Sequence, residues 1–123
     1  MNSAESDQRS ECLIRDIVAR VGDKWTLYVI IHLGEGTRRF RELHRQIDGI
    51  SERMLTVTLR SLERDGLVTR TVFPVVPPKL EYSLTEMGAS LMKTATRLFA
   101  WVDDHRSEIS EARAEYDARI VAS

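Results

Sequence analysis

The segment from Ile50 to Val68 constrains the fold more than any other part of this chain. Ser51 is a residue type that caps helix N-termini, and Gly66 can adopt the left-handed conformation that ends a helix. Apolar residues between them recur at the spacing of one helix face, namely Leu55, Leu59 and Leu62. This pattern predicts a single amphipathic helix whose leucine face is buried and whose opposite face is exposed.

The exposed face of this predicted helix carries residue types that suit a DNA major groove. Arginine offers two parallel donors to a guanine edge, and threonine or valine methyl groups can contact thymine. Arg53 and Thr56 lie near the N-terminal end, which would enter the groove most deeply. Arg60 and Arg64 lie further along and would contact phosphate, as would the Ser51 hydroxyl and the helix-terminal amides. The candidate DNA-binding residues of this helix are Ser51, Arg53, Met54, Thr56, Val57, Arg60 and Arg64.

The local charge supports this prediction although the whole chain is nearly neutral, with a formal net charge of −1. Between positions 38 and 70, eight arginines stand against five acids, whereas between positions 85 and 123 five basic residues stand against seven acids. The basic excess therefore lies where contact with a polyanion is predicted. The alternative is a solvated helix whose arginines only pair with Glu63 and Asp65.

The residues before and after this helix predict a shorter helix and a β-hairpin. A short strand at positions 37–40 would lead into the shorter helix, and Asp48-Gly49 would form the turn between the two helices. The hairpin strands are expected at positions 68–73 and 79–84, with a proline-rich tip that cannot continue the ladder. Lys79 is a candidate DNA contact or a lysine that protects a strand edge. Arg38 and Arg39 are candidate phosphate clamps or ordinary surface arginines.

Further helices are expected at both ends of the chain. We expect a disordered leader at positions 1–9, a first helix from about Ser10 to Ala19, and an apolar, central helix capped by Asp23. Thr85 would cap a long helix that reaches at least to about Asp104. Positions 10–104 would form one domain, followed at positions 105–123 by a helical extension or a frayed tail.

An apolar stripe on the long helix predicts that two copies of the chain pair. The stripe is too apolar for a free surface and too long for so small a core, and an isologous dimer would bury it. The first helix would join the same interface. Two recognition helices related by a two-fold axis would read an inverted repeat. The candidate dimer-interface residues are Leu13, Ile17, Leu91, Ala95, Leu98 and Val102.

Several sequence blocks, in the same order, resemble the HxlR-type winged helix-turn-helix regulators, which are related to the MarR family. The resemblance runs from Cys12 to about Trp101. It implies a mainly α fold with a β-hairpin wing and a homodimeric, DNA-binding transcription factor. The blocks are Gly22-Asp23-Lys24-Trp25-Thr26, Arg39-Phe40-Arg41-Glu42-Leu43, Gly49-Ile50-Ser51-Glu52-Arg53-Met54-Leu55, Leu62-Glu63-Arg64-Asp65-Gly66-Leu67-Val68 and Val76-Pro77-Pro78-Lys79-Leu80-Glu81-Tyr82-Ser83-Leu84-Thr85.

The chain departs from the family pattern at three positions. Asp23 stands where this family commonly has a second glycine, and Leu13 stands where proline often follows the cysteine. Val75 lies at a wing-tip position that is often polar.

Cys12 admits two interpretations. As in several members of the resembling family, it could be a redox or electrophile sensor. A place in the first turn of a helix, with Arg15 nearby, would favour its thiolate, whereas Glu11 would oppose it. The alternative is a small, buried, apolar residue. A single cysteine excludes an intramolecular disulfide and fits a cytoplasmic, reducing compartment, but it permits a disulfide between subunits.

Other classes of function find little support in the sequence. The three histidines lack the spacing of metal ligands, and no phosphate-binding loop or catalytic constellation is apparent, so we expect no metal, no cofactor and no enzymatic activity. No apolar run reaches the roughly 20 residues of a membrane span. A small-molecule effector is possible, with Trp25 and Tyr28 either lining its pocket or packing in the core. The alternative function is a winged-helix protein-interaction module that does not bind DNA.

Overall fold

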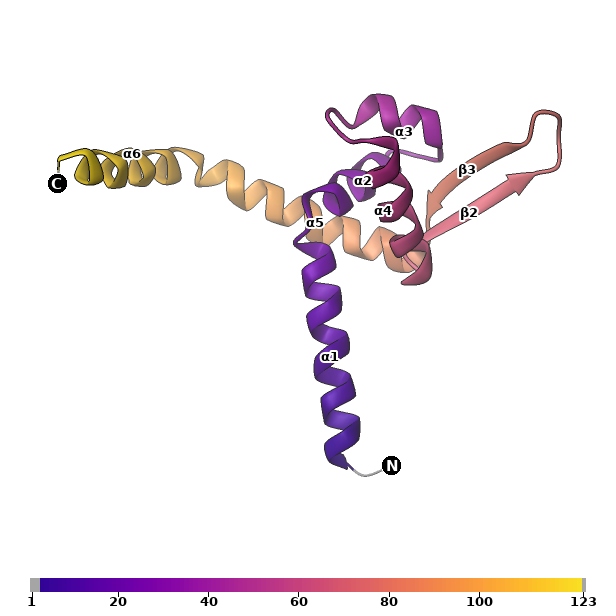
Figure 1. Cartoon of the computed structure of the whole chain (residues 1–123), viewed down its shortest axis with the longest axis horizontal. Helices are drawn as coiled ribbons and strands as arrows, with labels where there is room; N and C mark the ends of the chain where they lie inside the picture. Colours follow the sequence, from indigo (N-terminus) through magenta and orange to yellow (C-terminus); the bar gives the residue numbers. More distant parts are fainter. Residues whose placement is uncertain (1–2, 123) are drawn as a thin grey trace.

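The computed structural model, which describes residues 3 to 122, combines six helices with a three-stranded antiparallel sheet. The central body holds α2, α3, α4 and the sheet (Figure 1). From it α1 projects as one arm, and α5 continues into α6 as a second arm, while the β2–β3 wing projects on another side. In chain order the elements are α1 (Ser3–Val21), α2 (Lys24–Gly34), β1 (Arg38–Arg39), α3 (Phe40–Gln46), α4 (Glu52–Arg64), β2 (Val68–Phe73), β3 (Lys79–Leu84), α5 (Glu86–Asp104) and α6 (Arg106–Ala122).

The core lies where α2 packs against α4, the sheet and the first part of α5. α2 begins at Asp23, whose carboxylate accepts hydrogen bonds from the backbone N–H groups of Trp25 at 2.8 Å and Thr26 at 3.2 Å. The aspartate that replaces the second glycine of the family motif therefore caps the central helix, as predicted. The largest fully buried side chains of the core are Ile30, Leu43, Leu55, Leu59, Leu62 and Val29.

The amphipathic helix predicted between Ser51 and Gly66 is confirmed as α4. The Ser51 hydroxyl accepts a hydrogen bond from the Met54 backbone N–H at 3.0 Å, and Leu55, Leu59 and Leu62 are buried. Gly66 follows the helix with a φ of +76°, a conformation that favours glycine. Local signals in the sequence therefore specified both ends of this helix and its buried face.

The sheet anchors the wing to the body. Its strand order is β1-β3-β2, and the pairing of Arg38 with Tyr82 joins the short first strand to the hairpin. The expected strand before α3 is thus confirmed, and it adds a third strand to the predicted hairpin. Tyr82 points into the core, where burial raises the pKa of its hydroxyl above the ordinary value of 10.0.

Two expectations about the chain ends change. The leader predicted at positions 1–9 is wrong for residues 3–9, because α1 begins at Ser3 and not near Ser10. This stretch has no glycine or proline, and Glu5 lies favourably in the first helical turn. Positions 1 and 2 lie outside the described residues. The C-terminal segment is a helical extension up to Ala122, and Ser123 again lies outside the description.

The apolar stripe of α5 divides between two environments. Ala95 is fully buried and Leu91 packs against the core, whereas Leu98 and Val102 are each 44% exposed. Ala95 therefore serves the core of its own chain and is not available to a dimer seam, whereas the assignment of Leu91, Leu98 and Val102 to such a seam stays a prediction.

Candidate DNA interface

The exposed face of α4 presents three arginines and two apolar side chains. Arg53, Arg60 and Arg64 are exposed, and Met54 and Val57 are 40% and 50% exposed. A convex helix face of this composition can contact base edges through guanidinium groups and thymine methyls through apolar ones.

Thr56 is less available than the other predicted contacts. Its side chain is half-buried, and its hydroxyl donates a hydrogen bond to the Glu52 carbonyl one turn earlier, at 2.9 Å. The methyl group can still meet a base, but the hydroxyl proton is already bonded within the helix.

Two acids near the C-terminal arginines of α4, Glu63 and Asp65, are engaged elsewhere. Glu63 pairs with Arg70 of β2, with Nε and Oε2 3.5 Å apart, and Asp65 pairs with Arg20 of α1 at 2.8 Å. Among residues 3–122, no ion pair joins Glu63 or Asp65 to Arg53, Arg60 or Arg64. The alternative in which those arginines merely pair with Glu63 and Asp65 is therefore not what the fold contains.

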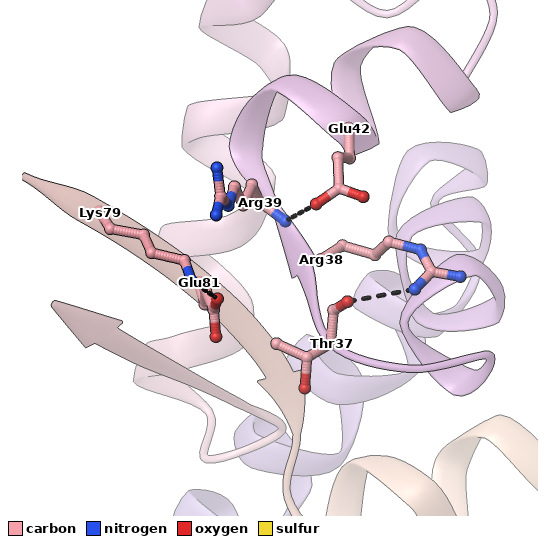
Figure 2. Close-up of polar contacts among 6 residues, drawn as sticks. All are labelled: Thr37, Arg38, Arg39, Glu42, Lys79 and Glu81. Atoms are coloured by element: carbon pink, nitrogen blue, oxygen red, sulfur yellow. Dashed lines mark hydrogen bonds and ion pairs between the residues drawn. The ribbon is translucent and has the colours of Figure 1, made fainter. Parts of the chain in front are cut away.

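Arg38 and Arg39 point in different directions from β1, as Figure 2 shows. The Arg38 guanidinium turns back to its own loop, where Nη1 donates to the Thr37 carbonyl at 3.1 Å and Nη2 lies 3.6 Å from the Glu35 carboxylate. The Arg39 side chain is exposed, while its backbone N–H donates to Glu42 at 3.0 Å. Of the two predicted clamps, Arg39 is the one presented to solvent.

Lys79 is occupied within the wing. Its ammonium lies 3.0 Å from Glu81 Oε1 (Figure 2). The same ammonium lies 5.2 Å from the ring centroid of Phe73, on the neighbouring strand β2. A phosphate would have to compete with Glu81 for this ammonium.

A groove between α3 and the wing contains two arginines that the sequence analysis did not single out. It has a volume of about 940 Å³, and its lining balances the basic side chains Arg39, Arg41, Arg45 and His44 against the carboxylates of Glu42, Glu52 and Glu81. A second hollow shares Arg39 and Arg41 and continues to the wing tip. The missed signal was the four-residue spacing of Arg41 and Arg45, which puts both on one face of α3.

Cys12 lies in the middle of α1 and is exposed. Both earlier premises are therefore wrong: the thiol is neither in a first helical turn nor buried in the core. Asp16 and Ala19, four and seven residues later, share its helix face and border a hollow of about 290 Å³ with Met54 and Val57. The cysteine accordingly lies on the α1 face that continues toward the recognition helix.

The two arms expose apolar side chains. On α1, Leu13 is 62% exposed and Ile17 is half-buried. On α5, Tyr28 of the body stacks against Phe99, with ring centroids 6.3 Å apart, next to exposed Leu98 and Val102. These surfaces have no covering element within the described part of the chain.

A small hollow beside Tyr28 is the candidate for the effector pocket, because Tyr28 was one of the two residues expected to line such a pocket. The hollow has a volume of about 310 Å³ and is lined by Tyr28, His32, Gln46, Ile47 and Asp48. Trp25, by contrast, packs against the core. Within residues 3–122, no group of histidine, cysteine or acidic side chains could hold a metal ion, and no helix is long and apolar enough to cross a membrane.

The fold and the α4 surface define a winged helix-turn-helix protein of the transcriptional regulator class, which is not an enzymatic class. The chain belongs to the family of HxlR-like helix-turn-helix proteins, whose family model matches residues 20–110. It is 38% identical over 105 residues to the HTH-type transcriptional regulator YtfH of Escherichia coli, covering 85% of this chain and 83% of that protein.

Solved structures agree in fold. The redox regulator HypR in its reduced form matches with a TM-score of 0.74 and 38% identity, covering 80% of this chain and 97% of that one. Diamide-treated YodB from B. subtilis matches with a TM-score of 0.65 and 34% identity, covering 73% and 89%. The resemblance stated from the sequence blocks is thereby confirmed.

Proposed function

We propose that this protein is a homodimeric transcriptional regulator that binds a specific DNA sequence through α4. The observation that carries the proposal is the set of exposed α4 arginines, Arg53, Arg60 and Arg64, while the nearby acids Glu63 and Asp65 are paired with Arg70 and Arg20. Arginines bind DNA by neutralising its phosphates and by donating to base edges, so they must be exposed and free of competing carboxylates. A regulator of this kind would act in the cytoplasm, where it reaches its operator.

The two surfaces beside α4 would position the duplex. Arg39, Arg41 and Arg45 line the groove between α3 and the wing and would contact the phosphodiester backbone, although Glu42, Glu52 and Glu81 line the same groove and reduce its positive potential. In the proposed complex Arg53 reads a base edge, whereas Arg60 and Arg64 contact phosphates. Ser51 adds its hydroxyl and the amides at the α4 N-terminus.

Dimerisation would come from the two projecting arms. Exposed Leu13 and Leu98, with half-buried Ile17, supply apolar area that a second copy could bury. A two-fold axis would then present two α4 helices to successive major grooves, about 34 Å apart, on an inverted repeat.

Selection from a library of random DNA duplexes tests the proposal. We expect enrichment of an inverted repeat, and binding that weakens steeply with salt, with a log-log slope of about −0.9 for each phosphate neutralised. A library that enriches no sequence, together with binding that is flat in salt, would instead support a winged-helix protein-interaction module. A duplex with scrambled half-sites is the control for specificity.

A redox signal is the better supported of two candidate modes of regulation. Two structural neighbours, HypR and YodB, are described as a redox regulator and as a diamide-treated transcriptional regulator. Cys12 of this chain is exposed on an arm that would approach a second copy. The proposed step joins two Cys12 thiols into an intersubunit disulfide, while diamide accepts the two electrons and two protons.

Diamide treatment followed by duplex binding tests this regulation. The wild-type protein should form a covalent dimer on a non-reducing gel and change its affinity for the selected duplex, and dithiothreitol should reverse both effects. Cys12→Ser should not respond. If wild-type affinity is the same before and after treatment, the remaining candidate is a small-molecule effector, for which the hollow beside Tyr28 is the proposed site.

A further inference from the structure

The residues Asp65-Gly66-Leu67, which follow α4 directly, join the proposed recognition helix to both projecting arms. From α1, Arg20 Nε donates to Asp65 Oδ2 at 2.8 Å. From the start of α5, the Thr85 hydroxyl donates to the Gly66 carbonyl at 2.6 Å, and the Thr85 backbone N–H donates to the Leu67 carbonyl at 3.1 Å. This three-residue segment, here called the α4 junction, is therefore bonded to both α1 and the start of α5.

The two attachments differ in kind. On the α5 side the backbones are in close contact, because a Cβ added at Gly88 would lie only 2.0 Å from the Leu67 carbonyl oxygen. On the α1 side the polar link is the Arg20–Asp65 ion pair, which spans 45 positions of the chain. The α5 attachment is thus part of the packed body. α1 packs on α2, but its link to the α4 junction is one pair of side chains.

The ion pair is well placed to hold α1. Both side chains are largely withdrawn from solvent, with exposed fractions of 27% for Arg20 and 14% for Asp65, so the pair is screened less than a surface pair. Asp65 caps the C-terminus of α4, where a negative charge opposes the helix dipole and a neighbouring cation offsets that cost. Without Arg20, α1 could turn about the break at Gly22-Asp23.

We infer that Arg20 is a positioning residue for DNA binding: through Asp65 it fixes the angle between α1 and α4. This inference rests on the proposed function, since two α4 helices must meet grooves about 34 Å apart. A small rotation of an arm relative to α4 would therefore misplace the second helix of a dimer. Arg20 would influence specific binding without contacting DNA.

Three variants test the inference: Arg20→Ala, Asp65→Asn, and the exchanged pair Arg20→Asp with Asp65→Arg, which keeps the net charge. The probes are the duplex selected by the wild-type protein and a scrambled duplex of equal length. Each single variant should bind the selected duplex about ten-fold more weakly, and the exchanged pair should restore most of that affinity. Binding of the scrambled duplex should change by less than about two-fold. Arg15→Ala, which removes an exposed arginine of the same helix, is the matched control.

Amide hydrogen exchange in the absence of DNA provides a second measurement. The backbone N–H groups of Asp65, Gly66 and Leu67 donate to α4 carbonyls, and their protection should fall in both single variants and return in the exchanged pair. If selection from the random duplexes enriches no sequence, the proposed function fails. The hydrogen-exchange measurement still shows whether the Arg20–Asp65 pair holds α1 to α4.

Two outcomes would overturn the inference. Suppose that Arg20→Ala weakens binding of both duplexes, that Asp65→Asn binds like the wild-type protein, and that the exchanged pair does not recover affinity. Arg20 would then be a direct phosphate contact. If protection of the α4 junction is the same in all variants, the ion pair does not hold the two helices together.

Discussion

At the scale of single residues, the fold separates arginines that are engaged from arginines that are exposed. Arg38 bonds to its own loop and Arg20 pairs with Asp65, so both are committed within the chain. Arg53 and Arg60 are exposed on α4. Since all four are the same residue type, their different roles follow from what surrounds each guanidinium group.

The proposed division of labour between Arg53 and Arg60 predicts different effects of alanine substitution. Arg53→Ala should cost about 1 to 3 kcal/mol on the selected duplex and relax the base preference at one position. Arg60→Ala should weaken selected and scrambled duplexes alike and reduce the salt slope by about 1. Titrations at several salt concentrations measure both effects, with Arg113→Ala of α6 as control. Identical behaviour of the two variants would refute the division.

At the scale of elements, the start of α5 depends on close backbone packing. Thr85 caps the helix by accepting a hydrogen bond from the Gly88 N–H at 3.0 Å, and Gly88 lies directly against the Leu67 carbonyl. No sequence signal identified Gly88, because nothing in the local helical pattern distinguishes a glycine that close packing requires from one that the helix merely tolerates.

Gly88→Ala should therefore destabilise the protein, although alanine is the better helix former by about 1 kcal/mol. The added Cβ has no space, and displacing α5 from the α4 junction should cost about 3 kcal/mol of unfolding free energy in urea titrations. Gly22→Ala is the matched control, because its Cβ would meet the nearest atom at 3.4 Å. Equal stability of the Gly88 variant and the wild-type protein would mean that α5 shifts without cost.

At the scale of the whole molecule, two helical arms project from the body (Figure 1), and both carry exposed apolar side chains. Leu13 of α1 and Leu98 of α5 are 62% and 44% exposed, and Trp101 is 54% exposed. A free surface of this composition is unusual for a monomer. The arms are therefore the surfaces on which the proposed dimer depends.

Leu98→Asp should place a charge in the proposed seam and shift the protein to monomers in light scattering. Affinity for the selected duplex should fall sharply, because one half-site supplies only part of the contacts. Val121→Asp, at an 86% exposed position near the end of α6, is the control and should remain dimeric. A dimer that survives Leu98→Asp would locate the interface elsewhere.

The sequence by itself determined the elements whose signals are local. Ser51, Asp23 and Thr85 marked helix starts correctly, and the leucine spacing of α4 identified its buried face. These features could be predicted because a cap or an amphipathic face depends on residues within one or two helical turns. The order of the sequence blocks likewise identified the family.

Only the tertiary structure decided which distant groups meet. It paired Arg20 with Asp65 across 45 positions, buried Ala95 in the core, and left no space beside Gly88. It also extended α1 so that Cys12 lies in the middle of a helix. Local periodicity carries no information about these contacts, because they depend on how whole helices pack and on which charges that packing withdraws from water.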